Sequence, residues 1–310
     1  MSLTTSTITL NDGRAMPALG LGTFQNDACE QVVYDAIKAG YRHIDTAFIY
    51  RTEEAVGNAV ERAIFDGIVA RSDLWITTKV WPTYHDRVPQ SVDKSLALLK
   101  TDYIDLLLVH WPVALNGDPN DDYSFLPKRE DGEIDITEGD DWISFYKQLE
   151  TEQKTGRVKS IGVSNVSSVY LERLLEHASV IPAVNQFENH PLLPQKDQIE
   201  ANLKQGIQIT AYSPLGSGQG VINLHENPTI VELAEKYNTS TASILINWHI
   251  CQGRSVIPKT ANSLRVVSNA VKVEISAQDL AKIDAISAEH GTHRTVPFHL
   301  FKKDCLGYPV

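Results

Sequence analysis

Short apolar runs alternate along the chain with stretches in which apolar residues recur every three or four positions. The short runs have the length of strands, and the stretches between them have the spacing of amphipathic helices. The predicted strands are residues 19–22, 41–45, 74–79, 103–110, 160–163, 183–186, 207–211 and 255–258. Alternating strands and helices form parallel βαβ units, and eight units in about 250 residues are typical of a closed (β/α)8 barrel. We therefore predict a TIM barrel that spans residues 1–310 as a single domain.

A hairpin is predicted ahead of the barrel. Residues 7–10 and 15–19 are apolar runs that flank Asn11-Asp12-Gly13, and an Asp-Gly turn between such runs is typical of a β-hairpin. We expect this hairpin to cap the N-terminal mouth of the barrel. In the first helix after it, Asp27 and Glu30 resemble a capping box.

Two segments do not fit the alternation of strands and helices. Residues 113–140 form a long acidic loop, and the tail after Ser276 becomes irregular beyond a short helical pattern. Loops of that length in compact domains usually form lids or binding loops. We expect both segments to cover the C-terminal face of the barrel.

The composition is that of a globular protein, with 42% hydrophobic and 22% charged residues among 310. The net charge of −11 predicts a surface that repels nucleic acid and anionic lipid. Cys29, Cys251 and Cys305 lie far apart, which indicates neither a disulfide framework nor a zinc site. The N-terminal residues have no signal-peptide character. We expect a cytoplasmic protein that binds neither nucleic acid nor membrane, and a monomer, with a dimer left open.

Four residues that can donate or hold protons stand at or just past the ends of predicted strands: Asp45, Tyr50, Lys79 and His110. The C-terminal ends of barrel strands meet on one face. A neighbouring ammonium favours phenolate, so we expect Lys79 to lower the pKa of Tyr50, while Asp45 holds Lys79 charged and oriented. A proton donor beside a site for a substrate oxygen, which His110 could bind, suits carbonyl reduction. Each residue alone is more often structural, but the four together indicate a catalytic site.

The motifs around these residues resemble those of the aldo-keto reductases over essentially the whole chain. The first family signature is matched by GYRHIDTA at 40–47, and the third by IPKT at 257–260, where Ser is the usual last residue. Further blocks follow in the family's order: LGLGTF at 19–24, KVW at 79–81, HWP at 110–112, GVSN at 162–165, NQ at 185–186 and AYSPLG at 211–216. The chain is most similar to fungal members, which include reductases of sugars, glycerol-type trioses and keto esters.

The resemblance implies NADPH-dependent reduction of aldehydes and ketones to alcohols. In it Tyr50 is the general acid, Lys79 and Asp45 tune that acid, and His110 positions the carbonyl group. None of the four residues carries a hydride, so a cofactor must supply it, and no Rossmann fingerprint is present. The resemblance implies that NADPH is bound by Thr23, Ser164, Asn165, Gln186, Tyr212, Ser213, Leu215, Ser217, Lys259, Thr260, Arg265 and Asn269.

Some of these cofactor residues have simpler interpretations from the residues alone. Lys259 and Arg265 follow the eighth strand, where barrels commonly bind phosphate, but they could be a solvated pair. Ser164 and Asn165 could serve as a helix N-cap. Relatives often have Glu before the adenine-facing Asn, where this chain has Ser268.

The resemblance also implies an apolar pocket above the nicotinamide, formed by Phe24, Ile49, Trp81, Trp111 and Phe298. The substrate class that follows is aldehydes and activated ketones, and the sequence favours no particular member of it.

Other functions remain open at this point. An NADP-dependent polyol or sugar dehydrogenase would run the same reaction in the oxidative direction, and a non-catalytic barrel could sense nucleotides. A metal-dependent hydrolase would need converging His and carboxylate ligands. We expect His43 and Asp45, two residues apart on one strand, to face opposite ways, and we predict no metal site.

Overall fold

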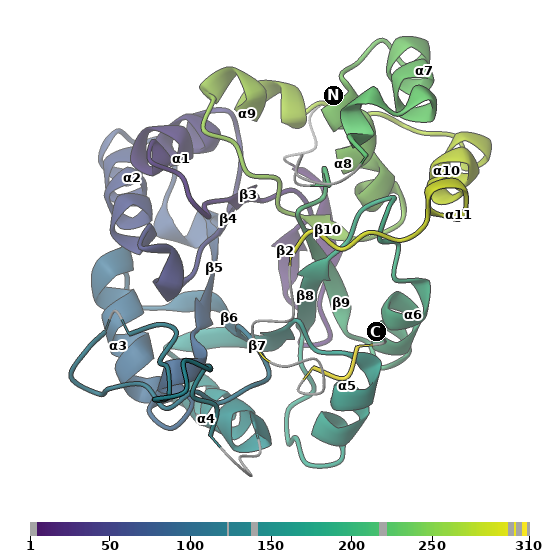
Figure 1. Ribbon diagram of the computed structural model, residues 1–310. Coiled ribbons are helices and arrows are strands. Elements are labelled where there is room, and N and C mark those ends of the chain that lie inside the picture. Colours follow the sequence, from purple (N-terminus) through teal and green to yellow (C-terminus); the bar gives the residue numbers. More distant parts are fainter. Residues whose placement is uncertain are drawn as a thin grey trace.

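The computed structural model of the chain describes residues 5–122, 124–137, 142–216, 222–296, 301 and 306–308. Within them, eight parallel strands curl into a ring, which Figure 1 shows end-on. In ring order they are β3 (Leu21–Gly22), β4 (His43–Asp45), β5 (Trp75–Val80), β6 (Ile104–Val109), β7 (Val158–Ser164), β8 (Val184–Glu188), β9 (Gln208–Tyr212) and β10 (Ser255–Val256). Bridges from Leu19 to Val256 and from Gly22 to Lys259 close the ring. The predicted (β/α)8 barrel is confirmed.

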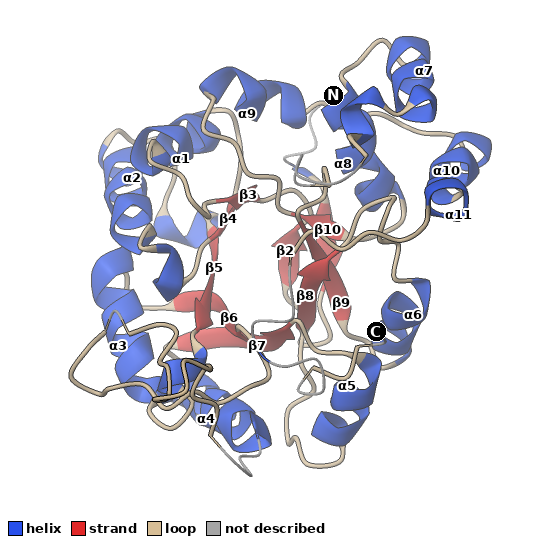
Figure 2. Ribbon diagram, in the orientation of Figure 1, coloured by secondary structure: helices blue, strands red, loops and turns tan. Residues whose placement is uncertain are grey.

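Helices surround the ring on its outer side (Figure 2). They are α1 (Cys29–Lys38), α2 (Glu53–Phe65), α3 (Val88–Leu99), α4 (Trp142–Thr155), α5 (Ser168–Leu175), α6 (Lys196–Lys204), α7 (Pro228–Lys236), α8 (Thr241–Cys251), α9 (Ser263–Asn269), α10 (Ala277–Asp284) and α11 (Ile286–His290). Short 3₁₀ helices lie in the connections: η2 (Phe48–Tyr50), η3 (Arg71–Asp73), η4 (Pro82–Tyr84) and η5 (Leu224–Glu226). Val56 and Val60 of α2 belong to the same buried apolar cluster as Ile76 of β5, so the main core lies between helices and ring. None of these helices has the length and apolarity that a membrane span needs.

The hairpin forms as predicted and closes the N-terminal mouth of the barrel. Its strands β1 (Thr7–Thr9) and β2 (Ala15–Pro17) are antiparallel, with Ile8 opposite Met16. Met16 is fully buried in a cluster with Trp75, the first residue of β5. The amide of Asn11 donates to the carbonyl of Pro182, just ahead of β8, at 2.9 Å.

The predicted capping box of the first helix is wrong. Helix α1 begins at Cys29, and its N-cap, Ala28, has no side-chain oxygen to offer. Asn26 takes part instead, because its side-chain oxygen accepts from the Ala28 N–H at 3.2 Å. The chain leaves the helix through Gly40 at φ +99°, a left-handed conformation that glycine adopts without steric cost.

The long loop and the C-terminal tail both lie against the C-terminal face of the barrel. The indole N–H of Trp81, just past β5, donates to the carbonyl of Phe125 in the loop at 2.7 Å. Phe301 of the tail packs on Trp111, with ring centroids 5.1 Å apart. Both segments therefore contribute to the walls of the space above the strand ends.

Candidate active site

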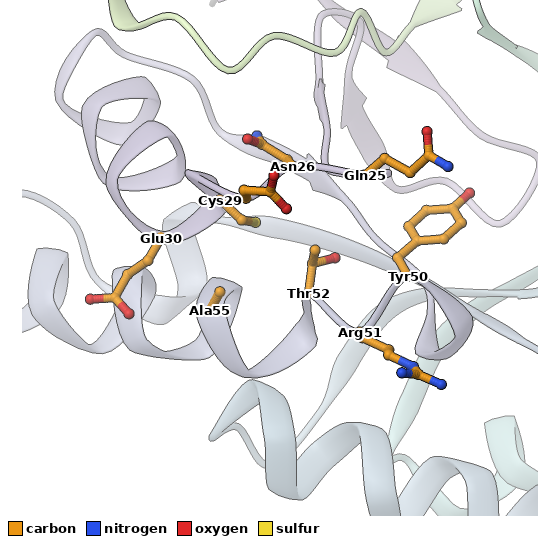
Figure 3. Close-up of a pocket in the computed structure, with 9 residues that line it drawn as sticks. Gln25, Asn26, Cys29, Glu30, Tyr50, Arg51, Thr52 and Ala55 are labelled. Carbon is orange, nitrogen blue, oxygen red and sulfur yellow. The ribbon is translucent and has the colours of Figure 1, made fainter. Parts of the chain in front are cut away.

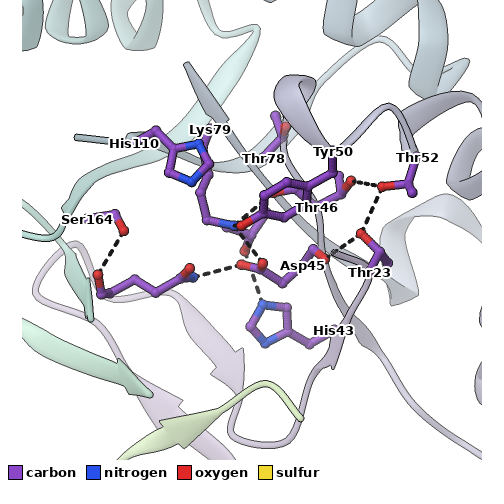
Figure 4. A network of polar contacts seen from close by, with 12 residues as sticks. Thr23, His43, Asp45, Thr46, Tyr50, Thr52, Thr78, Lys79, His110 and Ser164 are labelled. Carbon is purple, nitrogen blue, oxygen red and sulfur yellow. Dashed lines mark hydrogen bonds and ion pairs between the residues drawn. The ribbon is translucent and has the colours of Figure 1, made fainter. Parts of the chain in front are cut away.

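The structure brings Asp45, Tyr50, Lys79 and His110 together at the C-terminal mouth of the barrel (Figure 4). Asp45 ends β4, Tyr50 ends η2, Lys79 is the next-to-last residue of β5, and His110 directly follows β6. The ammonium of Lys79 lies 2.6 Å from Oδ1 of Asp45 and 3.5 Å from the hydroxyl of Tyr50. It also donates to the carbonyl of Thr46 at 2.9 Å. The parallel register of the strands thus gathers the acid–base groups that the sequence places after them.

The phenol of Tyr50 and the imidazole of His110 face each other edge-on, with ring centroids 5.6 Å apart. Phe24 packs against the Tyr50 ring from one direction at 4.9 Å, and Trp81 packs against His110 at 5.1 Å. Nδ1 of His110 is buried with no hydrogen-bond partner among the described residues. The two proton-bearing rings are held beside one another by aromatic contacts.

The expected lowering of the Tyr50 pKa is wrong for this state of the protein. Burial raises the pKa of the phenol more than the Lys79 ammonium lowers it, and the Asp45 carboxylate adds to the rise. Burial alone would lower the pKa of Lys79, but Asp45 and Tyr50 raise it above its ordinary value. Burial, with help from the Lys79 charge, holds the pKa of His110 well below its ordinary value. At neutral pH the site therefore holds a protonated phenol, an ammonium and a neutral imidazole.

His43 and Asp45 do not face opposite ways, so that prediction is wrong. Strand residues two apart lie on the same face, and both side chains enter the barrel. Nε2 of His43 lies 3.0 Å from the hydroxyl of Thr77, which is one strand away and two residues before Lys79. Burial lowers the pKa of His43 to about 4, so the ring is neutral. Within the described residues no group of three or more His, Cys, Asp or Glu side chains could hold a metal ion.

Hydroxyl groups behind the four residues form a network, of which the sequence analysis named Thr23 alone and as a cofactor residue. Thr23 donates to the carbonyl of Asp45 at 3.0 Å and lies 3.1 Å from the hydroxyl of Thr52, which in turn lies 3.1 Å from that of Thr46. Next to Thr52, Glu53 is 1% exposed and accepts from Thr78 at 2.6 Å. The Thr and Glu residues close to Asp45 and Lys79 in the sequence could have indicated this network, although such residues are common in loops.

The predicted nicotinamide-binding residues bond to one another and to the acid–base residues. The amide of Asn165 donates to the carbonyl of His110 at 3.0 Å, and its oxygen accepts from the hydroxyl of Tyr212 at 2.7 Å. The amide of Gln186 donates to Oδ2 of Asp45 at 2.7 Å, which ties β8 to the acid–base group. The alternative that Ser164 and Asn165 cap a helix is wrong, because Ser167 caps α5.

A cleft of about 810 Å³ opens above the strand ends, a size typical of small-molecule and cofactor sites. The predicted residues that line it are Thr23, Phe24, Asp45, Ile49, Tyr50, Trp81, His110, Trp111, Ser164, Asn165, Gln186, Tyr212, Ser213, Leu215 and Lys259. Lys79 is wholly buried and does not line it. Thr260, Arg265 and Asn269 do not line it either and lie in or just before α9. Ser217 and Phe298 fall outside the described residues. Amide and hydroxyl groups beside the phenol, with a lysine in the same cleft, fit a nicotinamide nucleotide.

A smaller polar hollow of about 430 Å³ adjoins the cleft (Figure 3). Tyr50 and Gln25 line both spaces, so the loop after β3 and the end of η2 form the wall between them. Gln25 and Arg51 have φ values of +48° and +57°, and the chain turns sharply at both residues. Tyr50 therefore separates the two spaces.

Comparison with known proteins places these features in a family. The aldo/keto reductase family model matches residues 12–288. D-galacturonate reductase of Hypocrea jecorina is 43% identical over 280 residues, which cover 90% of this chain and 89% of that protein. Glycerol 2-dehydrogenase (NADP(+)) of Saccharomyces cerevisiae is 40% identical, with 96% of this chain and 97% of that protein covered.

A solved structure agrees with these relatives. The aldo-keto reductase of Bombyx mori in complex with NADP superposes with a TM-score of 0.82 at 32% identity, covering 94% of this chain and 95% of that one. The barrel fold, the cleft above its strand ends and the sequence similarity all point to the same family. The chain belongs to the aldo/keto reductase family.

Proposed function

We propose that this protein reduces aldehydes and ketones to alcohols with NADPH, and that Tyr50 is the general acid. The observation that carries the proposal is the buried Lys79 ammonium, 2.6 Å from Asp45 and 3.5 Å from the hydroxyl of Tyr50, a residue that lines the cleft of the barrel. Relatives named as reductases, and one named for NADP, support the reaction class and the cofactor.

The four residues divide the proton chemistry among them. When bound, NADPH supplies the hydride. The phenol of Tyr50 donates its proton to the carbonyl oxygen, and its raised pKa keeps that proton in place until the oxygen gains negative charge. The Lys79 ammonium stabilises the phenolate left behind, and Asp45 keeps the ammonium charged. The neutral imidazole of His110 can donate a hydrogen bond that positions the carbonyl oxygen.

The cofactor roles are proposed residue by residue from the chemistry of the side chains. Amide and hydroxyl groups of Ser164, Asn165 and Gln186 suit the nicotinamide carboxamide, and Tyr212 offers a ring for stacking. The cations Lys259 and Arg265 suit the 2′-phosphate, because guanidinium and ammonium groups bind phosphate well. The remaining proposed contacts are those of Thr23, Ser213, Leu215, Ser217, Thr260 and Asn269.

The substrate side of the cleft is apolar. Phe24, Ile49, Trp81 and Trp111 line it, and we propose that they bind the carbon substituents of the carbonyl group. Phe298 lies outside the described residues, and its contribution to this pocket stays a prediction. The name of the yeast relative, a glycerol 2-dehydrogenase, makes oxidation of an alcohol by the same residues the second candidate function.

We also propose a cytoplasmic monomer whose whole length forms one domain. Cys29 and Cys251 are free thiols, which are typical of a reducing compartment. The continuous ring of strands, which runs from β3 to β10, supports a single domain. Gel filtration would test the monomer.

An absorbance assay tests the proposed function. Purified protein should oxidise NADPH when given an aromatic aldehyde, and a panel of aldehydes, keto esters and sugars with both cofactors would rank the substrates. The rate should be higher with NADPH than with NADH and should survive a chelator. Absence of any substrate-dependent oxidation of NADPH across the panel would refute the proposal.

A further inference from the structure

Glu188, at the end of β8, holds a carboxylate that the proposed chemistry does not use. The side chain is 0% exposed, and its carboxylate accepts four hydrogen bonds. Nε2 of His190 lies 3.0 Å from Oε1, and the N–H and hydroxyl of Thr295 reach the same oxygen at 2.8 Å and 2.5 Å. The N–H of Val296 reaches Oε2 at 3.1 Å. Three of the four donors therefore come from the C-terminal tail.

This carboxylate and the tail hold each other in place. Burial alone would raise the pKa of Glu188, but the hydrogen bonds from His190 and Thr295 hold it below its ordinary value. The group is therefore ionised at neutral pH. The Arg294 guanidinium lies 4.0 Å from Oε2 of Glu188. A buried carboxylate that lost its close hydrogen-bond donors would still be poorly compensated at that distance, which is unfavourable. The tail segment at Thr295 and Val296 is thus fixed to the end of β8.

The fixed segment is also part of the cleft wall. Thr295 and Val296 line the same cleft as Tyr50, and Val296 packs against the apolar cluster that contains Trp81 and Trp111. The position of Glu188 therefore sets where this part of the wall stands.

The tail has further attachments just ahead of this segment. The N–H of His293 donates to the carbonyl of Leu192 at 2.8 Å, and the guanidinium of Arg294 donates to the side-chain oxygen of Gln195 at 3.5 Å. Loss of the Glu188 bonds should therefore shift the wall without releasing the whole tail.

We propose that Glu188 is a positioning residue for substrate selection, which fixes Thr295 and Val296 as the wall that bulky carbonyl substrates contact. The reduction rate of a small aldehyde that does not reach Val296 should not depend on Glu188. The inference rests on the proposed function and deepens it, since it assigns selection among carbonyl substrates to a residue that touches neither the hydride nor the proton.

The test compares two aldehydes in variants of the full chain. Glu188→Gln keeps the shape of the side chain but replaces an acceptor with an amide, and Thr295→Val removes one donor and leaves Glu188 intact. Glu200→Gln on α6, an exposed residue paired with Lys204, is the matched control. The measurements are kcat and KM for a three-carbon hydroxyaldehyde and for a substituted aromatic aldehyde, together with the Kd of NADPH from fluorescence quenching.

The expected result is a change in selectivity. The selectivity is the kcat/KM for the aromatic aldehyde divided by that for the small aldehyde. Glu188→Gln should lower this ratio by about tenfold, mainly because the KM for the aromatic substrate rises. Thr295→Val should lower it by about threefold. In both variants, kcat for the small aldehyde and the Kd of NADPH should stay within about twofold of the parent values, because catalytic and cofactor groups are untouched.

A ratio that stays unchanged or rises in both variants would overturn the inference, and so would an equal loss of kcat for both aldehydes. If Glu188→Gln fails to fold, the Thr295→Val ratio decides alone. Failure of the parent protein to turn over any aldehyde would instead refute the proposed function. An active parent with unaltered selectivity in the variants refutes only the role of Glu188.

Discussion

The carboxylate of Asp45 and the ammonium of Lys79 form an ion pair 2.6 Å long, in which both side chains are almost wholly buried. The Lys79 ammonium is held more closely by Asp45 than by Tyr50, whose hydroxyl lies at 3.5 Å. The positive charge is thus fixed beside the phenol without removing its proton. This arrangement suits an acid that releases a proton only when the substrate oxygen becomes basic.

The Asp45→Asn variant should be much less stable than the parent. Removing one partner of a buried ion pair leaves the other uncompensated, which costs about 3–5 kcal/mol. Urea denaturation would measure the change in the free energy of unfolding. Asp102→Asn, at an exposed position next to β6, is the control and should change it by less than about 0.5 kcal/mol. A cost similar to that of the control would show that the pair does little for the fold.

The pH profile of reduction should be flat around neutrality. The pKa of His110 is held well below its ordinary value, and that of Tyr50 is raised above its own, so neither group titrates near pH 7. We expect kcat/KM for an aldehyde to be constant from about pH 6 to about pH 8 and to fall only at alkaline pH, where the phenol loses its proton. An acidic limb near pH 6.5 that disappears in His110→Asn would contradict this account.

Arg265→Ala should weaken NADPH binding selectively. If the guanidinium binds the 2′-phosphate, its loss should raise the Kd of NADPH at least about tenfold and leave that of NADH within about twofold. Fluorescence quenching titrations with both nucleotides measure the two constants. Lys204→Ala on α6, which removes an exposed cation paired with Glu200, should change neither. Equal weakening of both nucleotides would argue against the phosphate contact.

Glu53 should make stability depend on pH near neutrality. Burial raises the pKa of its carboxyl group to about 7, although bonds from Thr78 and Ser95 and the charge of Lys79 oppose the rise. The folded state therefore binds more protons than the unfolded state between about pH 4.5 and about pH 7, so stability falls as pH rises through that window.

The Glu53→Gln variant removes this titration. It should be more stable than the parent by about 3 kcal/mol at pH 8, and the advantage should disappear below about pH 4.5. Denaturation curves at several pH values would show it. Glu54→Gln, one residue along and exposed, should leave the pH dependence of unfolding unaltered. A variant less stable than the parent at pH 8 would mean that the ionised carboxylate is stabilising.

The sequence predicted the convergence of Asp45, Lys79 and His110 because each stands where an apolar run stops, and parallel strands of a barrel end on one face. It also predicted the hairpin, whose Asp-Gly turn is a local signal. It could not predict the direction of the Tyr50 pKa, which depends on whether burial outweighs a nearby charge.

The role of Glu188 could not be predicted from the sequence, because it depends on a contact between distant residues. Its principal partner, Thr295, is 107 residues away in the chain, and neither residue stands in a recognisable motif. The misplaced cap of α1 has a local cause, because Asp27 lies one residue before the N-cap position. The His43 error was one of strand geometry, since residues two apart share a face.

The most direct test of the proposed chemistry is the single-turnover rate of Tyr50→Phe, measured together with its affinity for NADPH. The substitution removes only the hydroxyl group, so turnover should fall by about 10²–10⁴-fold, and the Kd of NADPH should stay within about twofold of the parent value. Tyr103→Phe, whose hydroxyl bonds to the carbonyl of Arg71 at 3.4 Å near the opposite mouth of the barrel, should retain full turnover. A Tyr50→Phe protein that reduced aldehydes as fast as the parent would contradict the assignment of the general acid.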